Sequence, residues 1–277
     1  MTDTPPPRRG RVRRLLAGLV LTLVVLAAGA YGAFQWAVAQ YDAPGPLAEE
    51  RAVVIPRGAA TGTISERLEA AGVIDNARGF MLAVWATAEA GPLRAGEFAF
   101  PERASLRTVI ETLRSGRTVQ RRLTVPEGLT VAQILALLDE TEGLTGTISA
   151  PPPEGSLLPE TWAYSWGDSR ESLIRRMREA MDRALAEAWA QRAENLPFET
   201  PREALILASI VERETGVAAE RGRVAGVFVN RLRRGMPLQS DPTVIYAVTD
   251  GLGVMDRPIS RADLDADHPH NTYRNRG

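Results

Sequence analysis

Residues 200–216 read TPREALILASIVERETG, and the interpretation of the whole chain starts from this stretch. Thr200 supplies an N-cap hydroxyl, Pro201 suits the first helical position, and Glu203 completes a capping box. Almost every residue that follows is apolar, so we expect the helix to be buried around most of its circumference. The sequence therefore predicts a buried helix that carries Glu212 near its C-terminal end.

Glu212 lies at helical spacing on the same face as Leu205, Ala208 and Ser209. A carboxyl group on an apolar face is costly to ionise, so we expect it to keep its proton more readily than an exposed acid. A protonated carboxylic acid is suited to general acid catalysis. Glu214 lies about 200° further round the helix and should face away. The alternative is an ordinary ion pair between Glu212 and an arginine at the helix end.

Composition limits the chemistry that the rest of the chain can supply. The 277 residues are 44% hydrophobic and 24% charged, which is enough for one large or two modest domains. The chain has no cysteine, which excludes disulfides, thiolate metal sites and a cysteine nucleophile. Its net charge of −1 provides no basic excess, so we expect no nucleic-acid partner. The only histidines, His268 and His270, flank Pro269 in a stretch typical of a solvated loop, so we expect neither a metal nor a cofactor.

The N-terminal segment has the pattern of a membrane anchor. Residues 1–14 carry five arginines, and no residue from Leu15 to Tyr41 is charged, a run longer than the ~20 residues that span a bilayer. The positive flank predicts a cytoplasmic tail at 1–14, a transmembrane helix at 15–40, a linker at 41–50 and a remainder outside the cytoplasm. Ala37-Val38-Ala39 resembles a signal-peptidase site, but an apolar signal region is only about 7–15 residues long, so an uncleaved single-pass anchor is favoured.

One short sequence motif occurs twice in the chain. Ile55-Pro56-Arg57-Gly58 precedes a helix in which Thr63 and Glu66 form an expected capping box. Val125-Pro126-Glu127-Gly128 likewise precedes a second apolar helix. Each unit is typical of a strand, a Pro-x-Gly turn and a short helix.

Residues 51–122 predict a small mixed α+β subdomain. Between the two turns we expect a helix, a strand and a second helix, at Asn76–Glu89, Gly96–Phe100 and Ser105–Ser115. Small strand–helix–helix–strand modules of this kind resemble the LysM family of glycan-binding domains. A purely structural subdomain is the alternative.

Residues 123–277 predict a mostly helical α+β domain. Asp168 and Glu171 are expected to cap a long helix whose apolar stripe forms core. A helix at about Ala219–Arg234 should bury Val224, Val227, Phe228 and Leu232. Asp241 is a plausible N-cap for a short helix that begins at Pro242.

Several motifs of this domain closely resemble the YceG-like family of endolytic murein transglycosylases. They are ASIVERETG (208–216), VNRL (229–232), LQSDPTVIY (238–246), NTY (271–273) and LLPET (157–161). The anchor and the LysM-like region match as well, so the resemblance covers about residues 15–277. Family members continue beyond the Asn-Thr-Tyr element, so the resemblance implies that the C-terminal part of the catalytic domain is missing from this chain.

The resemblance implies cleavage of the MurNAc–GlcNAc bond inside peptidoglycan strands without addition of water. The essential glutamate of the family falls on Glu212. It would protonate the glycosidic oxygen and then take a proton from the MurNAc C6 hydroxyl, which closes a 1,6-anhydro ring. The implied setting is the bacterial plasma (inner) membrane, with the domain in the periplasm, a role in terminating glycan strands during wall assembly, and peptidoglycan synthases as partners.

Five further residues are expected to bind substrate. By the same resemblance, the side chains that would position sugar and polarise its acetamido group are Asn230, Gln239, Ser240, Asp241 and Tyr246. A helix-cap or packing role explains each of them about as well. Two other functions stay open. The chain could be a non-catalytic anchored peptidoglycan-binding scaffold, or a two-carboxylate muramidase-type hydrolase with Asp241 or Glu160 as the partner acid.

Overall fold

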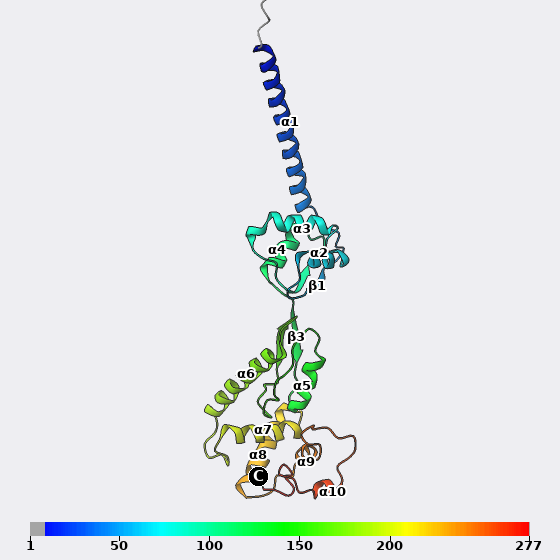
Figure 1. The fold of residues 1–277 in the computed structure, drawn as a ribbon. Coiled ribbons are helices and arrows are strands. Elements are labelled where there is room, and N and C mark those ends of the chain that lie inside the picture. Colours follow the sequence, from blue (N-terminus) through cyan, green and yellow to red (C-terminus); the bar gives the residue numbers. More distant parts are fainter. Residues whose placement is uncertain (1–8, 277) are drawn as a thin grey trace, which may run out of the picture. The chain divides into compact units, whose positions relative to one another are not determined.

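The computed structural model describes the backbone of residues 9–276 and the side chains of residues 16–276. The chain divides into two compact units, of which the first ends at Val119 and the second begins at Gln120. Each unit combines helices with a two-stranded antiparallel sheet, so the expected mixture of helix and sheet is confirmed (Figure 1).

Helix α1 (Arg9–Asp42) opens the first unit. Its stretch Leu16–Asp42 has a mean hydropathy of 2.1 and no buried side chain in its most apolar window. Among the described residues it is the one helix long and apolar enough to cross a membrane, although a signal sequence would share these properties. The helix is thus consistent with the expected single-pass anchor.

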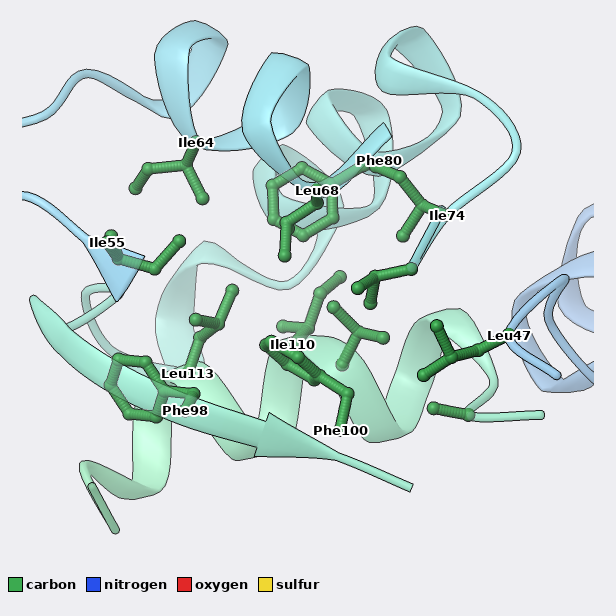
Figure 2. Packing of buried hydrophobic residues seen from close by; sticks show 13 residues of the cluster. Leu47, Ile55, Ile64, Leu68, Ile74, Phe80, Phe98, Phe100, Ile110 and Leu113 are labelled. Atoms are coloured by element: carbon green, nitrogen blue, oxygen red, sulfur yellow. The ribbon is translucent and has the colours of Figure 1, made fainter. Parts of the chain in front are cut away.

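The rest of the first unit folds around one small core. Its elements in chain order are β1 (Arg51–Ile55), α2 (Thr61–Ala70), α3 (Ala77–Ala86), a 3₁₀ turn (Ala88–Ala90), β2 (Gly96–Phe100) and α4 (Leu106–Ser115). Strand β1 pairs with β2 in the register Val53↔Phe98. Figure 2 shows Phe80, Phe98 and Phe100, from α3 and β2, among the apolar side chains that fill the core; all three are fully buried. Burying each aromatic ring contributes roughly 2–3 kcal/mol, so these rings fix the helices on the sheet.

The second unit has the same strand–turn–helix beginning. Its elements are β3 (Gln120–Thr124), α5 (Val131–Glu140), β4 (Thr161–Ser165), α6 (Arg170–Ala190), α7 (Pro201–Glu214), a 3₁₀ turn (Ala218–Glu220), α8 (Arg221–Arg233), α9 (Asp241–Val248) and α10 (Arg261–Leu264). One core cluster joins the sheet to α5 and α6, and a second lies between α7 and α8.

The Pro-x-Gly turns of both units are present as expected. Gly58 follows β1 with φ +75° and Gly128 follows β3 with φ +76°. Only glycine adopts this left-handed backbone without a steric penalty. Each turn therefore leads a strand directly into a helix.

Several local expectations are wrong. Helix α2 begins after Ala60 without a side-chain cap, so Thr63 and Glu66 form no capping box. Ser169, not Asp168 or Glu171, caps α6 by accepting the N–H of Ser172. These errors have one cause, because several Ser, Thr and Asp residues near a helix start compete and the sequence does not show which is in cap geometry.

The two helices that follow α7 also differ from expectation. Helix α8 begins at Arg221, and its Val227 is 54% exposed rather than buried, whereas Phe228 is buried as expected. Ser240 stands at the N-cap position of α9, so Asp241 is the first helical residue and not the cap.

Candidate functional site

Helix α7 begins as the sequence predicts but is not buried all round. Thr200 accepts the N–H of Glu203, and the Glu203 carboxylate accepts the N–H of Thr200, which completes the expected capping box. The buried residues of α7 are Leu207, Ile210 and Val211, whereas Ile206 is 49% exposed and Ala208 and Ser209 are exposed. The expectation of burial around most of the circumference is wrong, because the buried residues of α7 share one face. The uncovered side borders the site.

The Glu212 carboxylate forms an ion pair with the first residue of α8. Arg221 Nη2 lies 2.8 Å from Glu212 Oε2 and 3.1 Å from Oε1, and the Glu212 side chain is 24% exposed. The ion pair that the sequence left open is therefore present, although the arginine comes from the next helix and not from the end of α7. A cation at this distance stabilises the ionised form of a carboxyl group.

A second carboxylate shares the same arginine nitrogen. Arg221 Nη2 donates to Glu127 Oε2 at 2.8 Å, and Glu127 belongs to the Pro-x-Gly turn that follows β3. The hydrogen bond with Glu212, followed by attraction to Glu212 and Glu127, raises the pKa of the Arg221 guanidinium, which stays cationic. Its Nε is buried and has no hydrogen-bond partner among the described residues.

The turn backbone lies directly against the acid. A Cβ placed on Gly128 would meet Arg213 Cδ at 3.0 Å and Glu212 Cγ at 3.7 Å. The turn therefore brings Glu127 to Arg221, and a side chain at its glycine would have to displace the Arg213 side chain by a few tenths of an ångström.

A pocket of about 510 Å³ lies between α7 and α8, with Glu212 and Arg221 among its walls. Its other walls are apolar or glycine: Leu196, Phe198, Ala204, Leu207, Ala208, Val211, Gly222, Ala225 and Val229. A mostly apolar pocket with a few convergent charged groups is typical of a small-molecule or substrate site.

Three of the five predicted sugar contacts have hydrogen-bond partners other than Glu212 among the described residues. Ser240 is buried and donates to Glu214 Oε2 at 3.0 Å, so Glu214 engages a neighbouring helix start rather than simply facing away. Asp241 accepts the hydroxyl of Tyr273 at 2.6 Å. Gln239 Oε1 accepts from Arg231 at 3.3 Å.

The remaining two predicted contacts are Asn230 and Tyr246. Asn230 is exposed near the end of α8, and Tyr246 is half-buried with its ring edge-on to His270 at 5.0 Å. Burial, followed by the nearby negative charges of Glu154 and Asp250, raises the pKa of Tyr246. None of the five is among the described residues that form the pocket walls.

The two acids considered as hydrolase partners have other contacts. Asp241 accepts the hydroxyl of Tyr273, and the Glu160 carboxylate accepts the N–H of Thr161 at 3.2 Å. The carboxylate that shares a partner with Glu212 is that of Glu127. Within residues 9–276 no cluster of three His, Asp or Glu side chains is placed to hold a metal.

Glu154 holds the start of α5 in place. Its two carboxylate oxygens accept the N–H of Val131 at 3.0 and 3.1 Å, and its backbone carbonyl accepts from Arg202 of α7 at 2.6 Å. Burial raises the pKa of Glu154, while the bond from Val131 acts in the opposite direction. Glu154 thus connects α5 to α7 and helps to fix the Gly128 turn at the site.

Comparison with known proteins identifies the family. The model of the YceG-like family matches residues 53–277. The chain belongs to the YceG-like family. This membership agrees with the resemblance of the motifs around Glu212.

Curated relatives extend the match over most of the chain. The endolytic murein transglycosylase of Streptococcus pneumoniae strain D39 is 28% identical over 319 residues, which covers 96% of this chain and 56% of the relative. The enzyme of the same name from Bacillus subtilis is 29% identical and covers 80% of this chain and 69% of the relative. The chain thus spans little more than half the length of the S. pneumoniae relative. A crystal structure of a yceG-like protein from Listeria monocytogenes is 28% identical, has a TM-score of 0.45 and covers 83% of this chain and 84% of its own.

Glu127 and Arg221 are the two site residues that sequence reasoning missed. Glu127 stands in the repeated Pro-x-Gly turn. This motif predicts a turn between a strand and a helix, but it does not indicate a functional site. Arg221 and Glu127 are 94 positions apart, and no local pattern predicts contact over that separation.

Proposed function

We propose that this chain is a membrane-anchored lytic transglycosylase that cleaves MurNAc–GlcNAc bonds inside peptidoglycan strands. The names of the relatives support this substrate and reaction. The observation that carries the proposal is the position of Glu212, a half-buried acid at an accessible pocket beside an arginine that is shared with a second carboxylate.

Glu212 serves as acid and then as base. Its carboxylic acid gives a proton to the glycosidic oxygen while the bond from MurNAc C1 to that oxygen breaks. The C6 hydroxyl oxygen then attacks C1, and its proton passes to the Glu212 carboxylate. No water is consumed, the product carries a 1,6-anhydro ring, and the acid is ready for the next cycle.

Arg221 orients Glu212 in this scheme. Its Nη2 lies 2.8 Å from the carboxylates of both Glu212 and Glu127, which holds Glu212 at the pocket wall. Proton transfer to the glycosidic oxygen requires an acid that is positioned in this way.

The five residues expected to bind sugar divide by accessibility. Asn230, Gln239 and Asp241 are exposed and Tyr246 is half-buried, so these four remain the proposed sugar contacts beyond the cleavage point. Ser240 is buried against Glu214 and would support α9 instead of touching sugar.

The domain organisation follows from the same proposal. Residues 15–40 anchor the chain in the plasma membrane with residues 1–14 in the cytoplasm, residues 51–122 form a LysM-like glycan-binding subdomain, and residues 123–277 are catalytic. The order β1–α2–α3–β2 with antiparallel pairing supports the LysM-like assignment. A periplasmic enzyme that ends growing strands would act beside peptidoglycan synthases.

A two-carboxylate hydrolase is the second candidate, and Glu127 is the observation that favours it. Both carboxylates lie 2.8 Å from one nitrogen, close enough to flank a single glycosidic bond. In that case Glu127 would act as nucleophile or base, in place of the expected Asp241 or Glu160.

Mass spectrometry of the products distinguishes the candidates. The full chain, reconstituted in lipid, is incubated with uncrosslinked glycan strands. The proposal predicts internal cleavage with 1,6-anhydro ends, which are lighter than reducing ends by one water. Reducing ends would establish the hydrolase, and binding without cleavage would establish the scaffold.

A further inference from the structure

Helix α3 of the first unit is apolar on both of its faces. Its inner face packs on the core through Phe80, which is fully buried, with Ala83 and Val84 partly buried beside it. Figure 2 shows Phe80 directed into the core near Leu68 and Ile74. This contact already fixes the helix on the unit, so the apolar residues of the other face are not needed for folding.

The outer face leaves three large apolar side chains in solvent. Met81 is 38% exposed, Leu82 66% and Trp85 78%, and with exposed Arg78 they follow the helical spacing i, i+3, i+4 and i+7. Helices that are apolar all round are normally covered on all sides. A contiguous exposed apolar stripe marks a surface that another partner covers.

The end of the membrane helix is attached to the same core as α3. Arg107 of α4 forms an ion pair with Asp42, the last residue of α1, and its guanidinium lies 4.7 Å above the ring of Tyr41. Tyr41, Ala83 and Val84 all pack against one core cluster. Because α1 and α3 share this small core, α3 lies within a short distance of the point where α1 would leave the bilayer.

We propose that the outer face of α3 rests in the lipid headgroup region of the membrane that α1 crosses. The stripe fits that environment, because tryptophan favours the membrane interface and arginine can reach phosphates while its stem stays in apolar surroundings. Leu82 and Met81 then contact the acyl boundary, as the apolar face of an interfacial helix does. The inference depends on the proposed anchor, because it extends the contact of α1 with lipid to α3. The contact of α3 with lipid would hold the first unit on the bilayer surface, so that this unit does not pivot on the anchor.

The cysteine-free sequence allows a clean test with single reporters. A fluorescent label is attached to Ala86→Cys in the full chain, which keeps Met81, Leu82 and Trp85 intact. Matched labels go on Val24→Cys in α1 and on Glu66→Cys, an exposed position of α2. Each protein is placed in phosphatidylethanolamine–phosphatidylglycerol vesicles with and without nitroxide-labelled lipids, which carry the quencher in the headgroup region for positions 86 and 66 and deep in the acyl chain for position 24.

The expected result is loss of most of the fluorescence at positions 24 and 86 and little loss at 66. Quenching at 24 with none at 86 overturns the α3 inference and leaves the anchor standing. Absence of quenching at 24 contradicts the anchor itself, so the two failures are distinguishable.

A second variant separates docking from mere proximity. Adding Leu82→Glu and Trp85→Glu to the Ala86→Cys protein should abolish quenching at 86, while circular dichroism and quenching at 24 stay unchanged. Both changed side chains are exposed, so the core is not altered. Unchanged quenching at 86 would show that α3 only lies near lipid, and would overturn the inference.

Discussion

Arg221 and Glu212 are joined by an ion pair, with Nη2 of the arginine 2.8 Å from Oε2 of the acid. The same nitrogen lies 2.8 Å from Glu127 Oε2, so one cation serves two carboxylates. The arginine thereby connects the turn that follows β3 to the end of α7 and fixes the direction of the Glu212 carboxyl group, which proton transfer requires.

Removal of Arg221 should reduce cleavage. In Arg221→Gln the Glu212 carboxyl group loses the ion pair that orients it, so the rate should fall by about tenfold or more. The check is the initial rate of anhydro-end formation. Arg223→Gln, at an exposed position of the same helix, is the control, and an unchanged rate in Arg221→Gln would contradict the proposed role.

Neutralisation of Glu127 should have a smaller effect. In Glu127→Gln the guanidinium loses one of its two carboxylates but keeps the ion pair with Glu212, so most of the cleavage rate should remain. Glu160→Gln serves as the control, because that acid contacts the backbone of its own strand start. If Glu127 were instead a nucleophile, Glu127→Gln would lose cleavage at every pH, and this outcome would favour the hydrolase.

The two Pro-x-Gly turns provide a matched pair of glycine substitutions. Gly128→Ala and Gly58→Ala should each lower the free energy of unfolding by about 1 kcal/mol, because both residues have positive φ. A Cβ at Gly58 meets nothing within 4 Å, whereas one at Gly128 makes a tight contact with Arg213 Cδ at 3.0 Å and an ordinary contact with Glu212 Cγ at 3.7 Å. Only Gly128→Ala should therefore reduce cleavage. Equal activities of the two variants, measured together with thermal unfolding, would argue against contact between this turn and the acid.

Asp263 should stabilise the second unit at neutral pH and not in acid. Two hydrogen bonds from Arg257, together with the Ser260 hydroxyl and N–H, hold the pKa of Asp263 well below its usual range. A lowered folded-state pKa contributes stability above the unfolded value of about 3.9, and this contribution is lost as the pH falls.

Thermal unfolding of Asp263→Asn checks this dependence. The variant should melt below the wild type at neutral pH, and the difference should shrink as the pH falls through about 4 and below. Asp265→Asn removes an exposed pair with Arg261 and should change little at either pH. A difference for Asp263→Asn that does not depend on pH would rule out the ionic origin.

Local chemistry made part of the fold predictable. The capping box of Thr200 and Glu203, the strand Gly96–Phe100 and the left-handed turns at Gly58 and Gly128 each depend on residues close in sequence. These local predictions hold in the folded protein, because a proline, a glycine or a capping hydroxyl restricts the backbone conformation wherever the segment packs.

The site was less predictable, because contacts between distant segments build it. Apolar residues at Ile206 and Ala208 suggested burial, yet no element covers that side of α7. The motif containing Ser240 and Asp241 did predict a helix start, but its side chains engage Glu214 and Tyr273 instead of the acid. A single sequence also contains no signal that brings Arg221 to Glu127.

The most direct test is the yield of 1,6-anhydro ends from glycan strands treated with the full chain carrying Glu212→Gln. This isosteric change removes the proton donor and keeps the shape of the site, so we expect the yield to fall by about 10²-fold or more. Glu214→Gln, two residues along the same helix, should keep most of the activity, and circular dichroism should show both variants folded. A Glu212→Gln protein that still produces anhydro ends at the wild-type rate would contradict the assignment of Glu212 as the catalytic acid.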